Sequence, residues 1–384
     1  MTAISGILMD GPGAGYAYEM GWIRPVTEER RCREFLGRLN APVRFALVVG
    51  STQTAQIDGI SAAGATPFMR RYTAALDAEY LVHGRPLTMP DVPRNPLGPP
   101  SPVLISRASL MTLGLTALVI DAGCEISPLT PRLLLGTGPG RSIVTGNSLS
   151  LPADFVRTCK AAARMIANPG GVTVLAESVP GGTTTACSVL EALGVNALGR
   201  VSSSMPGGNH ARKEEVVKSA LDAAALGSDP DALLVAARVG DPMQPVVALL
   251  ALTASLTGTV VLGGGTQMAA VWALIVKLHR EGHEGSLENI CLATTRWVAE
   301  DSHSDLAGLL GQIDPPPAAF SASLDFSGCR SPGLVRYEEG LVKEGVGAGA
   351  AAFMALANQR ATLEELTEHI DRLAEKLDEP DENP

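Results

Sequence analysis

Three glycine-rich stretches of the sequence could bind an anion. The strongest covers residues 177–186, Glu-Ser-Val-Pro-Gly-Gly-Thr-Thr-Thr-Ala, and follows an apolar run typical of a buried strand. A glycine pair lets the backbone approach an anion, and a helix start offers N–H groups that have no partner within the helix. The threonine hydroxyls add further donors. We expect contact with a phosphate or a ribose here; the alternative is an ordinary strand-to-helix turn with a threonine cap.

The other two stretches have a similar pattern. Residues 207–213 place Lys213 in the first turn of a predicted helix, where the helix dipole disfavours a cation. This lysine therefore either extends into solvent or binds an anion at the helix start. Residues 262–267 contain three consecutive glycines after a predicted strand. Such glycines indicate either tight packing or the close approach of a ligand.

One carboxylate is a candidate for acid–base chemistry. Glu344 lies in a glycine-rich segment, 343–350, that leads into an apolar helix predicted at 351–357. A carboxylate next to a buried helix loses water, so its pKa rises, which is the condition for a general base near neutral pH. From spacing alone, the pattern favours the alternative, an ordinary surface glutamate before a helix.

Several common catalytic signatures do not occur. The sequence has no HExxH, no G-x-S-x-G and no His/Cys cluster with metal-ligand spacing. Residues 140–142 resemble part of a P-loop, but Arg141 stands where the lysine should be. Gly13 and Gly15 could begin a dinucleotide fingerprint, but Tyr18 occupies its third small position. We expect no metal site and no cofactor.

Composition excludes some partners. The 384 residues carry a formal net charge of −10, which argues against a nucleic-acid binder. Six scattered cysteines are typical of reduced thiols in a cytoplasmic protein. The uncharged stretch between Asp241 and Lys277 is long enough to cross a membrane, but its prolines and glycine triplet favour buried helix, strand and loop. We expect a soluble protein with no membrane partner.

Apolar runs alternate with helical patterns along the chain. Continuous apolar strands indicate burial on both faces of a parallel sheet, which binds ligands at the carboxyl ends of its strands. Residues 82–102 hold seven prolines and are predicted to form a loop or lid. Residues 312–318 are predicted to form a proline-rich link. Asn209 is the predicted N-cap of its helix. The predicted strands are 45–50, 117–121, 132–136, 172–177, 232–236, 259–262 and 290–293, and the predicted helices include 212–226, 245–255 and 266–280.

These stretches, in this order, resemble the nicotinate-nucleotide:dimethylbenzimidazole phosphoribosyltransferase family, and most closely its cyanobacterial and archaeal branch. The resemblance runs from about residue 45 to 357. The family's Gly-Asn-Thr-Thr loop resembles 177–185, and its Ala-Arg-Lys helix start resembles 211–213. Its glycine-rich strand end resembles 262–271, and its Gly-Glu-Gly-Thr-Gly-Ala segment resembles 343–348.

The chain departs from the family pattern at three places. Residues 50–55, Gly-Ser-Thr-Gln-Thr-Ala, replace the family's Gly-Asp-His-Gly stretch after the first strand. Gly182 replaces the asparagine of the Gly-Asn-Thr-Thr loop, and Lys343 replaces the glycine before the glutamate. The phosphate and ribose side of the site is therefore better supported than the side that binds the acceptor base.

The resemblance implies an α/β fold with a Rossmann-like, doubly wound, mostly parallel sheet. It places a nucleotide-binding domain at 41–311, with a smaller, mainly helical region built from 1–40 and 319–377, in a homodimer. The acidic tail at 378–384 is predicted to be disordered. Glu344 becomes the expected catalytic base. The residues expected at the phosphate and ribose are Glu177, Gly181, Gly182, Thr183, Thr184, Gly207, Gly208, Lys213, Gly264 and Gly265. Those expected at the base are Ser51, Thr52 and Gln53.

The implied reaction transfers the ribose 5-phosphate of nicotinate mononucleotide to an aromatic base, for the lower ligand of a cobamide. Nicotinate leaves from a positively charged ring nitrogen, so its departure needs neither a proton nor a metal. The alternative is a nucleotide-binding protein or sensor that has lost catalysis, which the altered residues at 51–55 favour. A phosphotransferase that uses residues 140–142 is more remote, because the lysine and the magnesium ligands are missing.

Overall fold

The computed structural model describes residues 13–89, 95, 97–136, 138–203 and 209–378. Within them, one eight-stranded sheet has the order β1-β8-β7-β6-β5-β2-β3-β4. All neighbouring strands are parallel except β1, which pairs antiparallel with β8. The strands are β1 (Ile23–Pro25), β2 (Val43–Gly50), β3 (Leu118–Gly123), β4 (Arg132–Leu134), β5 (Val172–Ser178), β6 (Thr259–Gly263), β7 (Ile290–Thr295) and β8 (Ala318–Ala322).

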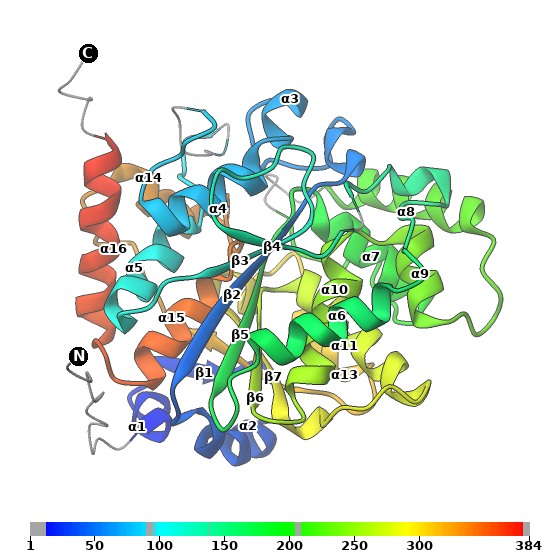
Figure 1. The fold of residues 1–384 in the computed structure, drawn as a ribbon. Helices are drawn as coiled ribbons and strands as arrows, with labels where there is room; N and C mark the ends of the chain where they lie inside the picture. Colours follow the sequence, from blue (N-terminus) through cyan, green and yellow to red (C-terminus); the bar gives the residue numbers. More distant parts are fainter. Residues whose placement is uncertain (1–12, 90–94, 96, 137, 204–208, 379–384) are drawn as a thin grey trace.

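Helices cover both faces of the sheet (Figure 1). Side chains alternate along each strand, so in β2 Ala46 and Val48 join one core while Phe45, Leu47 and Val49 join the other. The first core is closed by α6 (Phe155–Ile166), α7 (Gly182–Ala192), α8 (His210–Ala224), α9 (Ala232–Val239), α10 (Met243–Ala254), α11 (Thr266–Arg280) and α13 (Leu306–Gly311). The second is closed by α1 (Gly13–Glu19), α2 (Glu29–Leu36), α4 (Thr73–His83), α5 (Val103–Leu113), α14 (Pro332–Val335), α15 (Ala348–Ala357) and α16 (Leu363–Asp378). The predicted doubly wound α/β class is confirmed.

Short helices fill the connections between these elements. They are α3 (Pro67–Arg70), α12 (Arg296–Ala299), η1 (Gly37–Leu39), η2 (Gln53–Gln56), η3 (Ile143–Thr145), η4 (Leu287–Asn289) and η5 (Arg336–Glu339). The uncharged stretch after Asp241 forms α10, β6, a glycine loop and the start of α11, and every residue of α10 is buried. No helix in the described part of the chain is both long and apolar enough to cross a membrane.

Six of the seven predicted strands are present, but residues 232–236 form the start of α9 instead. Ala232, Val235, Ala236 and Val239 are buried at helical spacing, and so short an apolar run does not distinguish a strand from a helix. Strand β8 was missed because alanine is rare in strands. It forms because Phe320 lies between Phe35 and Phe353 in the second core.

The two ends of the described chain meet on one side of the sheet. In Figure 1, α1 lies against α15, and α16 packs on α5. Strands β1 and β8 also bring both chain ends into the main sheet. The separation of 41–311 from a smaller region made of the ends stays a prediction. Most of the predicted disordered tail, and residues 90–94 and 96 of the predicted lid, lie outside the described residues.

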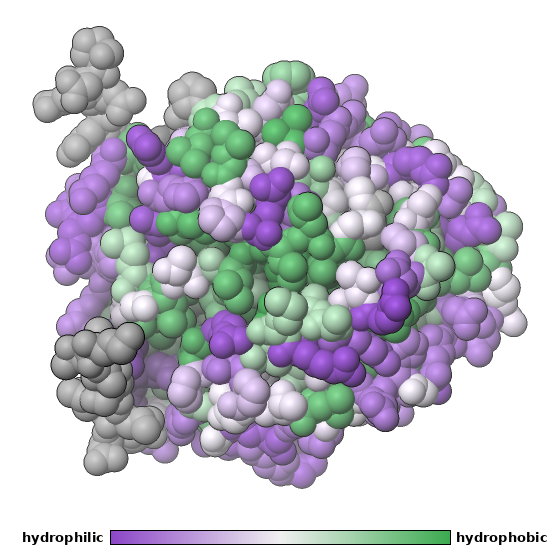
Figure 2. All heavy atoms as spheres, in the orientation of Figure 1, coloured by the Kyte–Doolittle hydropathy of each residue, from purple (hydrophilic) through white to green (hydrophobic). Residues whose placement is uncertain are grey.

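Strand β4 forms one edge of the sheet, beyond β3. Figure 2 shows apolar side chains gathered in this part of the surface, where Leu118, Leu129 and Leu134 are exposed. Backbone N–H and C=O groups along the outer side of an edge strand lack partners within the sheet. The strand at the opposite edge is β1, which pairs antiparallel with β8.

Candidate active site

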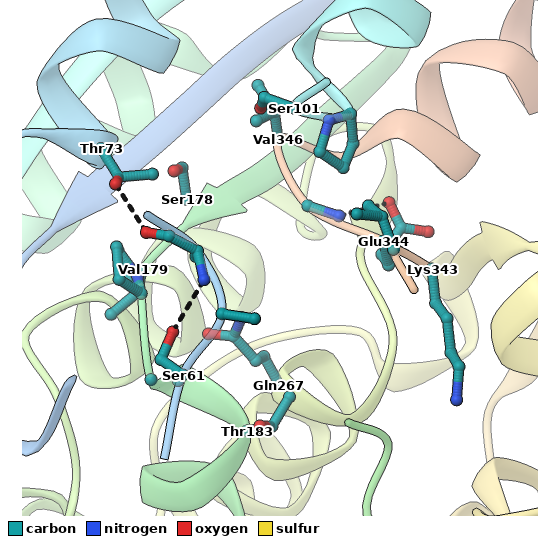
Figure 3. Close-up of a pocket in the computed structure, with 18 of the residues that line it drawn as sticks. Ser61, Thr73, Ser101, Ser178, Val179, Thr183, Gln267, Lys343, Glu344 and Val346 are labelled. Carbon is teal, nitrogen blue, oxygen red and sulfur yellow. Dashed lines mark hydrogen bonds between the residues drawn. The ribbon is translucent and has the colours of Figure 1, made fainter. Parts of the chain in front are cut away.

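A cleft with an empty volume of about 1010 Å³, part of it open to solvent, lies at the carboxyl ends of the central strands. The loop after β5 forms one wall and the loop after β6 another, and residues 342–346 lie across from them (Figure 3). Residues 60–64, from the long connection after β2, also line the cleft, together with residues of α4 and of the segments at 100–102 and 202–203. The cleft is therefore at the edge of the sheet where the sequence predicts ligand binding.

The loop between β5 and α7 is a tight turn built on glycine. Gly181 has φ = 77°, and a Cβ atom on it would lie 2.9 Å from Ala55 Cα. The N–H of Gly182 donates to the Val179 carbonyl at 3.0 Å, and α7 begins at Gly182. Thr183, in the first turn of α7, lines the cleft. The N–H of Thr184 likewise donates to the Gly181 carbonyl at 3.0 Å, so the N–H of Thr183 is the donor that the first turn of α7 can offer to an anion.

The other two threonines of this loop do not line the cleft. Thr185 donates its hydroxyl to Asp241 Oδ2 at 2.6 Å. Thr184 is fully buried, and its hydroxyl has no hydrogen-bond partner among the described residues. Of the two threonines predicted to contact the nucleotide, the structure places Thr183 at the cleft and Thr184 behind it.

Glu344 is held by four hydrogen bonds. Its Oε2 atom accepts from the Thr294 hydroxyl at 2.9 Å and from the Thr295 N–H at 2.8 Å. Its Oε1 atom accepts from the N–H groups of Gly345 (3.2 Å) and Gly349 (3.1 Å). Burial raises the pKa of Glu344, while these four donors oppose the rise. The predicted direction of the pKa shift is confirmed.

Close packing of α15 on β7 brings Glu344 to the end of the sheet. A Cβ atom on Gly349 would lie 1.9 Å from the carbonyl carbon of Thr294, so the two backbones touch. Glycine is the residue that permits this approach. The glycine-rich segment that marked Glu344 in the sequence is therefore what places its carboxylate beside β7.

A second carboxylate, Glu177, lies near the end of β5 and lines the cleft. It is 2% exposed, and its Oε2 atom accepts from the Val179 N–H at 3.2 Å. Burial raises the pKa of Glu177 well above its ordinary value, and the negative charges of Glu344 and Asp241 raise it further. Glu177 is therefore protonated more readily than an ordinary glutamate, and a protonated carboxyl can donate a hydrogen bond. Gly264 packs behind this side chain and does not line the cleft, whereas Gly265 does.

The third carboxylate of the cleft, Asp77, is one that the sequence analysis missed. It accepts hydrogen bonds from the Ser101 hydroxyl (2.7 Å) and the Ser178 hydroxyl (2.8 Å), and burial raises its pKa to about 6. Next to it, Thr73 donates to the Ala63 carbonyl at 2.7 Å (Figure 3). The signal that could have revealed Asp77 in the sequence is an acidic residue within a largely apolar helix. No group of three or more Asp, Glu, His or Cys side chains in the described residues could hold a metal ion.

The residues predicted to bind the acceptor base lie outside the cleft lining. Ser51 Oγ accepts from the Glu125 N–H at 3.1 Å, and Gln53 Oε1 accepts from the Ser142 N–H at 3.3 Å. The Thr52 hydroxyl donates to the Arg141 carbonyl at 3.3 Å. Thr52 and Gln53 thus connect the start of the loop after β2 to the turn at 140–142, and Ser51 connects it to Glu125, just after β3. Residues 60–64 of the same loop line the cleft instead.

Lys213 supports the cleft from behind. It is 2% exposed, and its Nζ atom donates to the Ser202 carbonyl at 2.6 Å. Burial lowers the pKa of Lys213 to about 7. Ser202 itself lines the cleft, so the lysine positions this wall. The predicted phosphate ligands Gly207 and Gly208 lie outside the described residues.

Asn209 precedes α8, as predicted, but it does not cap the helix with its side chain. It accepts from the Ser203 hydroxyl at 2.8 Å and donates to the Gly59 carbonyl at 2.6 Å. Both neighbours belong to segments that form the cleft, since Ser203 and Ile60 line it. Asn209 therefore connects two loops of the site. The N-cap prediction is wrong in its hydrogen bond, because a partner distant in sequence competes for the amide.

Comparisons with known proteins agree with this architecture. The chain is 46% identical over 315 residues to UPF0284 protein glr4139 of Gloeobacter violaceus, covering 81% of this chain and 82% of the relative. It is 40% identical over 336 residues to a UPF0284 protein of Pyrobaculum calidifontis, covering 86% and 96%. The chain belongs to the UPF0284 family. No family model matches this UPF0284 protein.

Two solved structures from Thermus thermophilus share the fold of this UPF0284 protein. One, described as CobT, has a TM-score of 0.54 and 16% identity, and the match covers 90% of this chain and 89% of that one. The other, described as nicotinate-nucleotide-dimethylbenzimidazole phosphoribosyltransferase, has a TM-score of 0.56 and 17% identity, with coverage of 92% and 96%. The resemblance inferred from the sequence is thus confirmed at the level of the fold.

Proposed function

We propose that this UPF0284 protein is a phosphoribosyltransferase that moves the ribose 5-phosphate of nicotinate mononucleotide to an aromatic base, giving the lower-ligand nucleotide of a cobamide. The observation that carries the proposal is that the first turn of α7 and the carboxylate of Glu344 line one cleft. The Thermus structure described as a phosphoribosyltransferase of this kind has the same fold, which supports the choice of reaction.

In this reaction the acceptor's ring nitrogen forms a bond to C1 of the ribose while the bond from C1 to the nicotinate nitrogen breaks. Nicotinate takes the bonding electron pair and leaves as a neutral pyridine ring, so no acid has to protonate it. The proton on the acceptor's second ring nitrogen passes to Glu344. Positioned proton transfer of this type contributes roughly 10²- to 10⁴-fold in rate.

The surroundings of Glu344 suit a general base, because they fix the position of its carboxylate and favour its protonation. Its two bonds to Oε1, from Gly345 (3.2 Å) and Gly349 (3.1 Å), are the longer ones, so an acceptor N–H would replace one of these. Burial raises the pKa of the carboxyl, which lowers the cost of protonating it. The bonds from Thr294 and Thr295 keep the carboxylate in place.

The donor nucleotide is expected at the opposite wall. Its phosphate would meet the turn that includes Gly181 and Thr183, and protonated Glu177 could donate to a ribose oxygen. The buried Oε1 atom of Gln267 has no hydrogen-bond partner in the described chain and suits a ribose hydroxyl donor. A Cβ atom on Gly182 would lie 1.8 Å from this oxygen. Gln267 thus fills the space that the asparagine side chain of the resembling family would occupy.

A nucleotide-binding protein without catalysis is the second candidate. The observation that favours it is the complete set of protein donors on Glu344, which leaves both carboxylate oxygens occupied. The position of Ser51, Thr52 and Gln53 outside the cleft lining also removes the expected contacts to the acceptor base. A homodimer and a cytoplasmic location remain predictions.

Turnover with a panel of bases tests the proposal. The protein is incubated with nicotinate mononucleotide and dimethylbenzimidazole, adenine or a phenol, and free nicotinate is measured by chromatography. Release that depends on an added base supports the transferase. Binding of the nucleotide by calorimetry, with no release for any base, supports the second candidate. Absence of binding contradicts both.

A further inference from the structure

The cleft has an unbalanced set of charged side chains. Among the described residues that line it, three are acids, Asp77, Glu177 and Glu344, and one is a cation, Lys343. A phosphate monoester carries about 1.5 to 2 negative charges near pH 7. Carboxylates repel such a group wherever they are ionised, so a phosphate ligand needs a cation in this cleft.

The Lys343 ammonium has a fixed position and spare donors. Its side chain is 11% exposed, and its Nζ atom donates to Asp301 Oδ2 at 2.6 Å. Asp301 in turn accepts from the His303 N–H (3.1 Å) and the Ser304 hydroxyl (2.9 Å). An ammonium group has three N–H donors, and this ion pair uses one. The others are available to a ligand in the cleft.

The ion pair lies beside two polar cleft residues. Asp301 Oδ2 also accepts from the Ser202 hydroxyl at 3.3 Å, and the Ser202 N–H donates to Thr266 Oγ1 at 3.0 Å. Thr266 is the first residue of α11, and the amino end of a helix carries partial positive charge. Lys343, Ser202 and Thr266 are therefore connected at one end of the cleft.

The other buried lysine of this region does not supply the missing charge. Lys213 is not among the cleft residues, and its Nζ atom is bonded to the Ser202 carbonyl at 2.6 Å. Lys213 therefore positions Ser202, whereas Lys343 is itself one of the cleft residues.

We propose that Lys343 is the cation that binds the phosphate of the substrate, with Asp301 as its positioning residue and Ser202 and Thr266 beside it. The assignment of this anion to the 5′-phosphate of a nucleotide rests on the proposed function. The resembling family has glycine at the position of Lys343, so this charge is a feature of the present chain. In this arrangement the phosphate would lie in the cleft between the glycine-rich turn after β5 and Lys343, so that backbone donors and one side chain bind it together.

Binding of ribose 5-phosphate, compared with ribose, tests this assignment by isothermal titration calorimetry. Lys343→Met is expected to bind ribose 5-phosphate about 10- to 100-fold more weakly than the wild type, the effect of losing a charge-assisted hydrogen bond. Lys343→Arg should recover part of the affinity. Lys218→Met, which removes an exposed lysine on α8, is the matched control and should bind like the wild type.

The double variant Lys343→Met/Asp301→Asn removes both charges of the pair, so it tests the ligand contact without leaving Asp301 buried and unpaired. Weak binding by both the single and the double variant supports the proposal. Wild-type affinity in the double variant, or no preference of the wild type for ribose 5-phosphate over ribose, overturns it.

Nicotinate release measured on the same samples separates this proposal from the proposed function. Phosphate binding that depends on Lys343, without release for any base, supports the anion site and contradicts the transferase. Release that Lys343→Met leaves unchanged at low nucleotide concentration overturns the anion site and leaves the transferase standing.

Discussion

Glu344 accepts a 2.8 Å hydrogen bond at Oε2 from the backbone N–H of Thr295, the last residue of β7. The carboxylate is thus attached to the sheet itself rather than to a flexible loop. Glu177, near the end of β5, faces the same cleft. Two carboxylates on neighbouring parts of one sheet edge influence each other's protonation, which makes the site sensitive to single changes in hydrogen bonding.

Thr294→Val should shift the pH dependence of catalysis. The hydroxyl of Thr294 donates to Glu344 and lowers the pKa of its carboxyl, so its loss raises that pKa. A base acts in its ionised form; the acidic limb of the kcat profile should therefore move to higher pH, by about one unit for one lost hydrogen bond to a charged group. Thr295→Val is the control, since that hydroxyl donates to the Lys343 carbonyl and not to Glu344. An unmoved limb in Thr294→Val contradicts the role of Glu344 as the base.

Asp77→Asn should become relatively more stable than the wild type as the pH rises. Burial raises the pKa of Asp77 from 3.8 to about 6. Below about pH 4 the carboxyl is protonated in both the folded and the unfolded chain, and the raised pKa costs nothing. Between about pH 4 and pH 6 the unfolded chain ionises first, so the wild type loses stability. The free energy of unfolding of Asp77→Asn, relative to that of the wild type, should therefore increase by about 2 to 3 kcal/mol between about pH 4 and about pH 7.

Urea denaturation at about pH 4 and about pH 7 measures this change. Asparagine can still bond to the hydroxyls of Ser101 and Ser178, because each serine can donate or accept. Asp222→Asn, at an exposed position on α8, is the control and should change the difference by less than about 0.5 kcal/mol. If the stability difference between Asp77→Asn and the wild type is the same at both pH values, the pKa of Asp77 is not raised in the folded protein.

Two glycine variants should separate binding from folding. In Gly182→Ala the new methyl group meets the end of the flexible Gln267 side chain, which can rotate away. This variant should keep its stability but bind the nucleotide about 3- to 10-fold more weakly, the effect of one neutral hydrogen bond. In Gly349→Ala the methyl group meets the backbone of Thr294 and Thr295, which cannot move. That variant should lose more than about 3 kcal/mol of stability.

Thermal unfolding and nucleotide titration of both variants check this contrast. If Gly349→Ala is as stable as the wild type, α15 does not pack against β7 as described. If Gly182→Ala binds the nucleotide like the wild type, Gln267 makes no contact with the ligand.

The elements that position the site could be predicted because their signals are local. Strand β5 and the turn at Gly181 come from one continuous segment of the sequence, in which an apolar run is followed by a glycine pair. The glycines around Glu344 are equally local, since they permit the contact between α15 and β7, but spacing alone favoured a surface glutamate there. The family resemblance was needed to make Glu344 the expected base. Residues 232–236 were mistaken for a strand, since their helical periodicity is visible only over the eight residues of α9.

The rest of the site depends on contacts between segments that are distant in sequence. Asp77 enters the cleft because Ser101 and Ser178 satisfy its carboxylate, and no spacing rule connects these three residues. Asn209 has the sequence position of a cap, yet its amide bonds to Ser203 and Gly59. The sequence also does not show where the side chain of Lys213 points, because a lysine in the first turn of a helix can face a ligand or the protein interior.

The most direct test of the central claim is single-turnover release of nicotinate by Glu344→Gln. The amide leaves at least one N–H without an acceptor, so a stability loss of about 1 to 3 kcal/mol is expected and unfolding is measured in parallel. Glu364→Gln on α16 is the control. We predict that Glu344→Gln binds nicotinate mononucleotide with an affinity within about threefold of the wild type and releases nicotinate about 10²- to 10⁴-fold more slowly. A rate within about tenfold of the wild type, from folded protein, would contradict the account.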